Sequence, residues 1–259
     1  MNNLSDMLWI ELRKAIRSKM PLWTALGSIF LPLGIAFLIF VAKHPEISQK
    51  LGLVSAKANL IAYSATDWPT YMTVYGEMIA AGGIILFILI ISWIFGREFA
   101  DRTLKDMLAV PVQRASIILA KFIVAAIWSA AMTVVIFIAG LVMGVVLKLP
   151  GGSVGVIFQG AALVMVCACL VFVADTPFAF FASAGRGYLL PLGVAILTMM
   201  MINLAIILGW GEYFPWAVPV IYAQGKSPLT PLSFWILFLT GLLGLVGTYL
   251  WWKYKDQSR

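Results

Sequence analysis

The side chains that could carry chemistry in this 259-residue chain are found mainly in two places. The segment "FGREFADRTLKDMLAVPVQRASIILAK" (residues 95–121) holds eight charged side chains of both signs within 25 residues. Asp175 lies in an otherwise apolar run, directly before Thr176 and Pro177. The chain has a single histidine, His44, so a His-based triad or a His-rich metal site cannot form within one chain. We therefore predict no catalytic residues and no metal site.

The charged segment is patterned as a helix. If the helix continues from Gly96, opposite charges fall at i,i+4 spacing in four pairs: Arg97–Asp101, Glu98–Arg102, Asp101–Lys105 and Arg102–Asp106. Each such pair adds about 0.2–0.5 kcal/mol in an exposed helix. Pro111 then breaks the helix, and Arg114 and Lys121 flank the return into the next apolar run. A hairpin needs only a few residues, so this long connection with both charge signs favours a surface that meets another protein.

Polar residues within apolar runs are the other candidates. Burying an ionisable group in a membrane is costly, so Asp175 is a functional hypothesis by default. Pro177 frees a backbone carbonyl that polar neighbours can satisfy. Asp175 with Pro177 is thus either a structural kink or part of a gate or substrate path. Asn203 is interpreted as a helix–helix contact or as a further member of that path.

The elements that must position these residues are membrane helices. The chain is 62% hydrophobic and 11% charged, whereas a soluble domain has about 25% charged residues. Several uncharged runs exceed the roughly 20 residues that a helix needs to cross a bilayer. The sequence therefore predicts an all-α membrane protein, a single transmembrane domain over residues 1–259, with six spans at Met20–Ala42, Tyr75–Phe95, Phe122–Leu147, Gly160–Phe181, Tyr188–Leu208 and Phe234–Trp252.

Two segments outside the spans also have distinctive patterns. Residues 4–19 place apolar side chains at helical spacing and basic side chains on other faces, which predicts an interfacial helix in the headgroup plane. This helix is either a simple anchor or a surface that also touches a cytoplasmic partner. Residues 209–233 combine aromatic residues with four prolines, which predicts short re-entrant helices before the last span.

The distribution of Lys and Arg predicts the orientation. With the N-terminus in the cytoplasm, 13 of the 18 basic residues lie inside and five lie outside, namely Lys43, Lys50, Lys57, Lys148 and Lys226. Short loops rich in Lys and Arg stay in the cytoplasm. Both termini are therefore predicted to be cytoplasmic, and the net charge of +7 requires no nucleic acid as a partner.

The charged segment resembles the signature loop of the type-2 permeases of ABC (ATP-binding cassette) exporters. Members typically show a glutamate, a Thr-Leu pair, a leucine-rich step, a proline, an arginine and "LLAK", which this chain matches at Glu98, Thr103, Leu104, Leu108, Pro111, Arg114 and Lys121. Members often have Gly before Thr-Leu, whereas this chain has Arg102. The resemblance covers essentially the whole chain, and "EYFPWAVPVIY" is most similar to the bacitracin and lantibiotic self-protection exporters.

The resemblance implies a function for the charged segment. In such exporters the loop after the second span, here residues 96–116, is a coupling helix that sits in a cleft of a separate ATPase subunit. Two permease chains, expected here as a homodimer in the plasma membrane, work with two ATPases that bind ATP and Mg. The coupling residues implied are Arg97, Glu98, Asp101, Arg102, Thr103, Leu104, Lys105, Pro111 and Arg114. Because exposed ion pairs contribute little to stability, Glu98 and Arg102 are expected to act by contact with the ATPase.

This chain itself is expected to be non-catalytic and without a cofactor. The "GKS" at residues 225–227 lacks the first glycine and the preceding strand of a phosphate loop. An amphipathic peptide antibiotic or a lipid-like molecule fits apolar helix walls, but sodium, a drug or a cofactor-maturation substrate stay open. Two other classes stay open as well: a membrane adaptor that docks an ATPase without transport, and a lipid-processing membrane enzyme. The enzyme would need clustered His, Asp or Ser at one interface, and an ATPase gene next to this one would favour the exporter.

The charge asymmetry gives a testable topology. Cysteines introduced at Ser55 and Ser227 should react with impermeant thiol reagents added outside intact cells, whereas a cysteine at Arg114 should not. Labelling at Arg114 from outside would reverse the orientation.

Overall fold

The computed structural model describes residues 3–43, 67–103, 112–225 and 229–254. Its helices are α1 (Asn3–Arg17), α2 (Met20–Lys43), α5 (Trp68–Ala100), α7 (Arg114–Val146), α8 (Val154–Asp175), α9 (Pro177–Ala184), α10 (Leu189–Ile207), the 3₁₀-helix η1 (Gly211–Tyr213), α11 (Val218–Gln224) and α12 (Pro231–Tyr254). Leu104, Lys105 and Pro111 of the expected coupling segment lie outside the described residues.

The prediction of an all-α protein with six spans is confirmed. The helices α2, α5, α7, α8 with α9, α10 and α12 are each long and apolar enough to cross a membrane. Helices α5 and α7 contain 33 residues each, so both are longer than the apolar runs that predicted them. At 1.5 Å per residue each is about 50 Å long, against a hydrocarbon core of about 30 Å. Their ends must therefore project from the hydrocarbon region or the helices must cross it at a tilt.

Polar caps start the two helices that run side by side through the centre. The Asp67 carboxylate accepts a hydrogen bond from the Thr70 N–H (3.0 Å), and Pro69 occupies the first turn of α5. The Ser153 hydroxyl accepts from the Val156 N–H (3.3 Å) at the start of α8. A further bond from the Trp68 N–H to the Pro150 carbonyl (3.0 Å) fastens these two starts together at one end of the molecule.

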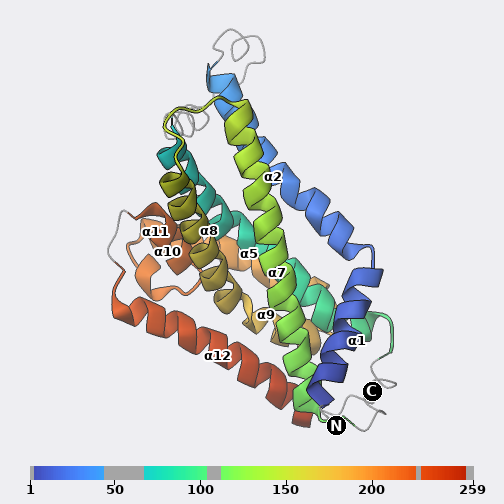
Figure 1. The fold of residues 1–259 in the computed structure, drawn as a ribbon. Helices are drawn as coiled ribbons and strands as arrows, with labels where there is room; N and C mark the ends of the chain where they lie inside the picture. Colours follow the sequence, from blue (N-terminus) through green and yellow to red (C-terminus); the bar gives the residue numbers. More distant parts are fainter. Residues whose placement is uncertain (1–2, 44–66, 104–111, 226–228, 255–259) are drawn as a thin grey trace.

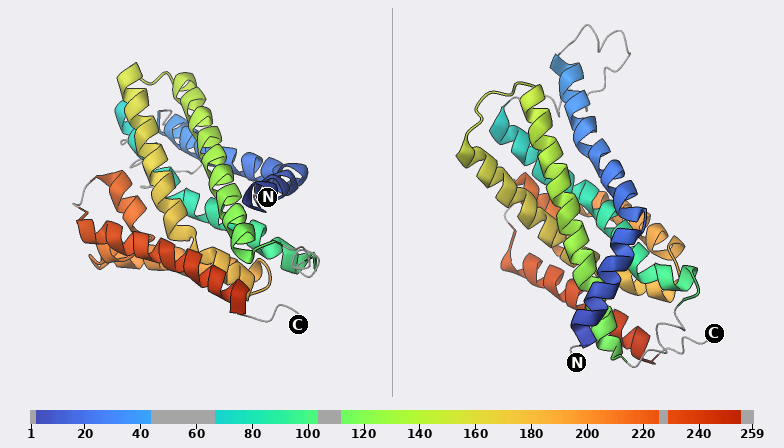
Figure 2. Two further views of the ribbon diagram at one scale, coloured as in Figure 1. Left: turned by 60° about the horizontal axis from the view of Figure 1, so that its bottom comes forward. Right: turned by 45° about the vertical axis from the view of Figure 1, so that its right-hand side comes forward.

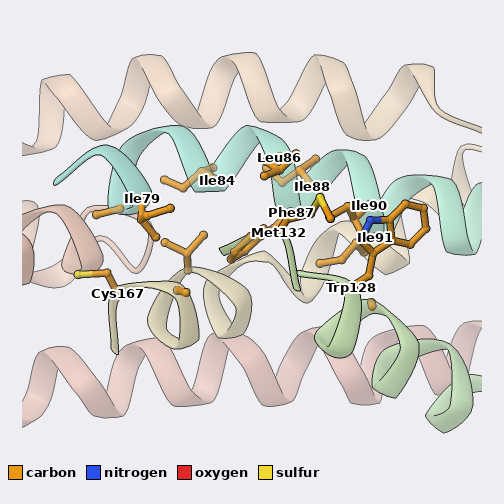
Figure 3. Close-up of a cluster of buried hydrophobic side chains, with 14 of the residues drawn as sticks. Ile79, Ile84, Leu86, Phe87, Ile88, Ile90, Ile91, Trp128, Met132 and Cys167 are labelled. Carbon is orange, nitrogen blue, oxygen red and sulfur yellow. The ribbon is translucent and has the colours of Figure 1, made fainter. Parts of the chain in front are cut away.

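The core is built around α5. This helix packs against α7, α8, α9, α10 and α11, and most of its residues are buried. Figure 3 shows its isoleucines meeting Trp128 and Met132 of α7 and Cys167 of α8. The Trp128 indole N–H also donates to the Thr24 hydroxyl (3.2 Å), so α2 is joined to the same core. The central helix α5 therefore contacts most of the other helices directly.

The outer helices expose large apolar side chains, as expected for surfaces that face lipid. Examples are Phe30 of α2, Met200 of α10 and Leu243 of α12. The helix α1 and the C-terminal end of α12 lie at the same end of the molecule (Figure 1), and two other views show the same arrangement (Figure 2). Arg97 and Arg114 belong to the elements that meet at that end.

The two segments predicted outside the spans, residues 4–19 and 209–233, both contain helices. Helix α1 packs on α7 and buries Met7, Glu11 and Ala15. In the segment 209–233, η1 and α11 are short, and α11 packs against α5 and α8. These helices agree with the expected secondary structure, and their depth in a membrane stays a prediction.

The break between α8 and α9 is covered by α12 through two glycines. A Cβ atom on Gly241 would meet the Val173 side chain at 2.6 Å, and one on Gly244 would meet the Pro177 backbone nitrogen at 2.5 Å. The Thr176 hydroxyl donates to the Gly241 carbonyl (2.9 Å) across this contact. Small residues allow such close approach of backbones in membranes.

This contact predicts different outcomes for two alanine substitutions in the same helix. Gly244→Ala should destabilise the protein by about 1–3 kcal/mol, because the new methyl group overpacks against backbone that cannot move away. Gly247→Ala, where no atom lies within 4 Å of the added carbon, should be neutral or slightly stabilising. Thermal unfolding of the two purified variants would test this, and equal midpoints would contradict it.

Candidate functional site

The helix α5 ends within the charged segment, at Ala100, and it ends in a defined motif. The Thr103 N–H donates to the Glu98 carbonyl (3.0 Å), and the Arg102 N–H donates to the Phe99 carbonyl (3.4 Å). These two bonds form a Schellman motif, in which the residue at the turn is left-handed and is usually glycine. Here that residue is Arg102, with φ of 58°. The turn that glycine favours in related permeases is therefore present in this chain without glycine.

The turn corrects the predicted run of i,i+4 pairs. Because α5 ends at Ala100, Glu98 and Arg102 do not lie on one helical face, and they form no ion pair. The Arg97–Asp101 pair does form, with its nitrogen and oxygen 3.2 Å apart, on the exposed side of the helix end. Pairs that include Lys105 or Asp106 lie outside the described residues.

Glu98 lies inside the protein, in a ring of four charges. Lys121 is fully buried, and its Nζ lies 2.8 Å from Glu98 Oε1 and 3.0 Å from Glu11 Oε2. Lys14 closes the ring at 3.0 Å from Glu11 and 3.2 Å from Glu98. The Lys121 ammonium also donates to the Ile94 carbonyl (3.1 Å). Two carboxylates and two ammonium groups thus join α1, α5 and α7 with no net charge.

The two carboxylates of the ring favour the charged form of Lys14. Partial burial alone would lower the pKa of Lys14, but attraction and hydrogen bonds from Glu11 and Glu98 outweigh it and raise this pKa. A buried ion pair is weak evidence for net stability, yet removal of one partner leaves an uncompensated charge. Glu98 is therefore a buried residue that holds helices together. This corrects the expectation that Glu98 is exposed and contributes little to the stability of the fold.

The start of α7 is fastened to a different helix. Arg114 Nη1 donates to the backbone carbonyls of Trp252 (2.6 Å) and Lys253 (3.0 Å), which satisfies the C-terminal carbonyls of α12. The Trp252 indole N–H in turn donates to the Ser183 hydroxyl (2.9 Å) of α9, and its ring meets Phe99 of α5 edge-on at 6.0 Å.

The charged segment therefore has two fixed roots. Its first root, at Glu98, is held by the ring that includes α1. Its second root, at Arg114, is held by α12. Between them, Asp101, Arg102 and Thr103 are exposed. The exposed residues thus lie between one residue that is fixed to α1 and another that is fixed to α12.

The second group of candidate residues lies around the break in the fourth span. Asp175 is fully buried at the end of α8, and Pro177 begins α9. Asn203 is elsewhere: it lies on the exposed face of α10, and its amide donates to the Met199 carbonyl of its own helix (3.0 Å). Asn203 thus makes no side-chain hydrogen bond to a second helix within the described part of the chain, and its interpretation as a helix–helix contact stays a prediction.

Sequence reasoning missed several residues that build this site. The pattern of residues 4–19 predicts an interfacial helix without a separate role for Glu11 or Lys14, and the sequence predicts Lys121 only as a charge that flanks a span. One signal was available: an acidic residue on the apolar side of a basic helix needs a buried partner. Nothing in the sequence marks Trp252 as the residue that links α9, α5 and α7.

Six helices that are long and apolar enough to cross a membrane define a multi-pass membrane protein. The family described as "ABC-2 family transporter protein" matches residues 7–203, which is well over half of the chain. The bacitracin transport permease protein BCRB of Bacillus licheniformis is 30% identical over 181 residues, covering 67% of this chain and 85% of the relative. The chain therefore belongs to the ABC-2 family of transporters and is an ABC transporter permease subunit.

The ring of charges predicts a large effect of removing its buried ammonium. Lys121→Met should cost about 3–5 kcal/mol of stability, because both carboxylates lose their shared partner. Asp101→Asn, which breaks an exposed pair, should cost about 0.2–1 kcal/mol. Denaturation of purified protein would measure both.

A double variant separates charge balance from packing. Glu98→Gln combined with Lys121→Met leaves the neutral pair Glu11–Lys14, so it should be more stable than Lys121→Met alone. Losses that simply add would show that charge balance is not what holds the ring.

Proposed function

We propose that this chain is the permease subunit of an ATP-driven exporter and that residues 96–116 dock onto a separate ABC ATPase. The ATPase binds ATP and Mg and hydrolyses the nucleotide, while this chain is non-catalytic and forms the path. The family and the bacitracin permease relative support the permease role.

One observation carries the docking proposal. The exposed turn at Asp101–Thr103 projects from a helix end that is fixed inside by four charges, and the chain re-enters the bundle at Arg114, which is fixed to α12. A loop without a mechanical role needs no such anchors at both roots. A docked ATPase that moves this turn would move α1 and α12 with it.

The working unit is proposed to contain two copies of this chain and two ATPases, in the plasma membrane, with both termini in the cytoplasm. Three features agree with that orientation: α1, the end of α12 and the charged turn share one end of the molecule (Figure 1). The positive-inside rule puts that end in the cytoplasm.

The proposed substrate is an amphipathic molecule exported from the membrane or the cytoplasm. The relative is named for bacitracin transport, and this chain covers most of its length. We extend that assignment to this chain as a peptide antibiotic of the same kind.

The docking proposal is tested by two arginines in matched conformations. Arg102 and Arg186 are both exposed, and each occupies the left-handed turn of a Schellman motif, with φ of 58° and 53°. Arg102→Glu should reduce the amount of ABC ATPase that co-purifies with the permease from native membranes at least several-fold, because it reverses a charge on the docking turn. Arg186→Glu, in the other described loop at the same end, should not.

The same pair of variants also tests function. Cells that depend on the exporter should lose resistance to bacitracin with Arg102→Glu and keep it with Arg186→Glu, while thermal stability is the same for both. Equal co-purification of the ATPase by the two variants would remove the docking role of this turn.

A further inference from the structure

A buried carboxyl group without a partner lies at the break between α8 and α9. Asp175 is fully buried, and neither of its oxygens has a hydrogen-bond partner among the described residues. No described lysine or arginine forms an ion pair with it, in contrast to Glu11 and Glu98. Burying an unpaired carboxylate is costly, so such a group persists only where the surroundings or a ligand compensate it.

The walls around this carboxyl are aromatic. The indole of Trp216 is its polar neighbour, although the indole N–H makes no hydrogen bond of normal geometry within the described structure. The Trp216 ring meets Phe178 edge-on at 6.2 Å and Phe214 at 5.4 Å. A carboxyl group next to a cluster of aromatic side chains is a combination that can attract organic cations.

An apolar groove lies next to this cluster. It has a volume of about 570 Å³, is shallow and open, and is lined by Leu229, Pro231, Phe234, Trp235 and Phe238. Leu229 borders this groove and also packs against the small buried cluster that includes Ala174 and Leu237. Trp216 packs against the same small cluster, so that cluster links the groove to the surroundings of Asp175.

We propose that Asp175, Trp216 and the adjoining groove on α12 form a binding site for an amphipathic organic cation. The carboxylate and the aromatic rings would take the cationic group, and the groove would take the apolar part. This inference rests on the proposed export function, because it names the chemical class of the exported substrate.

The cluster is built so that it can open. Trp216 belongs to the short segment between η1 and α11, which has Pro215 before it and Pro219 after it. Pro177 removes a backbone donor from the opposite wall, so the α8–α9 connection is held by packing against α12 and not by a continuous helical ladder. A shift of α12 would therefore loosen the glycine contact with Val173, Thr176 and Pro177, the residues on either side of Asp175.

The site is tested by direct binding to the full-length permease in lipid nanodiscs, without the ATPase. The probe is radiolabelled tetraphenylphosphonium, a lipophilic cation, and neutral triphenylphosphine oxide serves as the uncharged competitor. Wild type should bind the cation saturably, Asp175→Asn at least ten-fold more weakly and Trp216→Leu several-fold more weakly. Glu212→Gln, which removes a carboxylate from the same external segment, should bind like wild type.

Stability measurements distinguish a loss of cation binding from a loss of folding. Asp175→Asn should unfold at or near the temperature of wild type, since it replaces a buried carboxyl group that has no hydrogen-bond partner by an amide of the same shape, so weaker binding would not reflect misfolding. If Asp175→Asn misfolds, Trp216→Phe, which keeps the ring and removes the N–H, provides the comparison with Trp216→Leu and should retain most of the binding.

Three results would overturn the site: no saturable binding by wild type, equal binding by folded Asp175→Asn, or equal competition by triphenylphosphine oxide. None of these depends on the ATPase. Failure of the cation site therefore leaves the docking proposal intact, and failure of ATPase co-purification leaves this binding measurement intact.

Discussion

The ammonium group of Lys121 sets the arrangement of the end of the molecule where the charged segment is rooted. It is fully buried, and a lone ammonium in such a place would cost several kcal/mol of desolvation. Glu98 from α5 and Glu11 from α1 must therefore stay beside it, and Lys14 balances the second carboxylate. The N-terminal helix is consequently part of the bundle and not only an anchor on its surface. Any change in the angle of the α5 end has to be followed by α1 or has to break the ring.

The other root of the charged segment depends on a different kind of contact. Arg114 holds the terminal carbonyls of α12, and α12 meets the α8–α9 break through Gly241 and Gly244 with no room for a side chain. Tight backbone contact transmits displacement because packed interiors deform little. The charged segment is thus attached at Glu98 to the ring of four charges. At Arg114 it is attached to α12, which packs closely against the break between α8 and α9. Those two attachments are the physical basis for assigning a coupling role to the exposed turn between them.

The sequence predicted the six spans because long apolar runs have few other uses, and it predicted the charged segment because its charges stand out against that background. It did not predict the partner of Glu98. The i,i+4 pattern of charges is the same whether the helix continues or ends. The helix ends because Arg102 adopts a left-handed conformation, and the sequence has no glycine there to indicate it. Lys121 looked like an ordinary flanking charge for a similar reason: α7 begins seven residues before it, at Arg114, and so carries it into the interior. The kink at Pro177 was readable, but the glycine contact that covers it depends on how two distant helices meet.

The two buried acidic sites have opposite electrostatic properties, and this difference separates their roles. The ring at Glu98 is closed and neutral, so it gains nothing from an added cation and serves to fix helices. Asp175 has no cationic partner in the described structure, so it is the buried acid whose energy would change most when a cation arrives. The first site lies with α1, α5 and α7, where a partner's movement would enter, and the second lies with α8, α9 and α12, where a substrate would be held. Helix α5 packs against members of both groups, and Phe99 near its end meets Trp252 of α12. Helix α5 is therefore in contact with helices at both buried acidic sites.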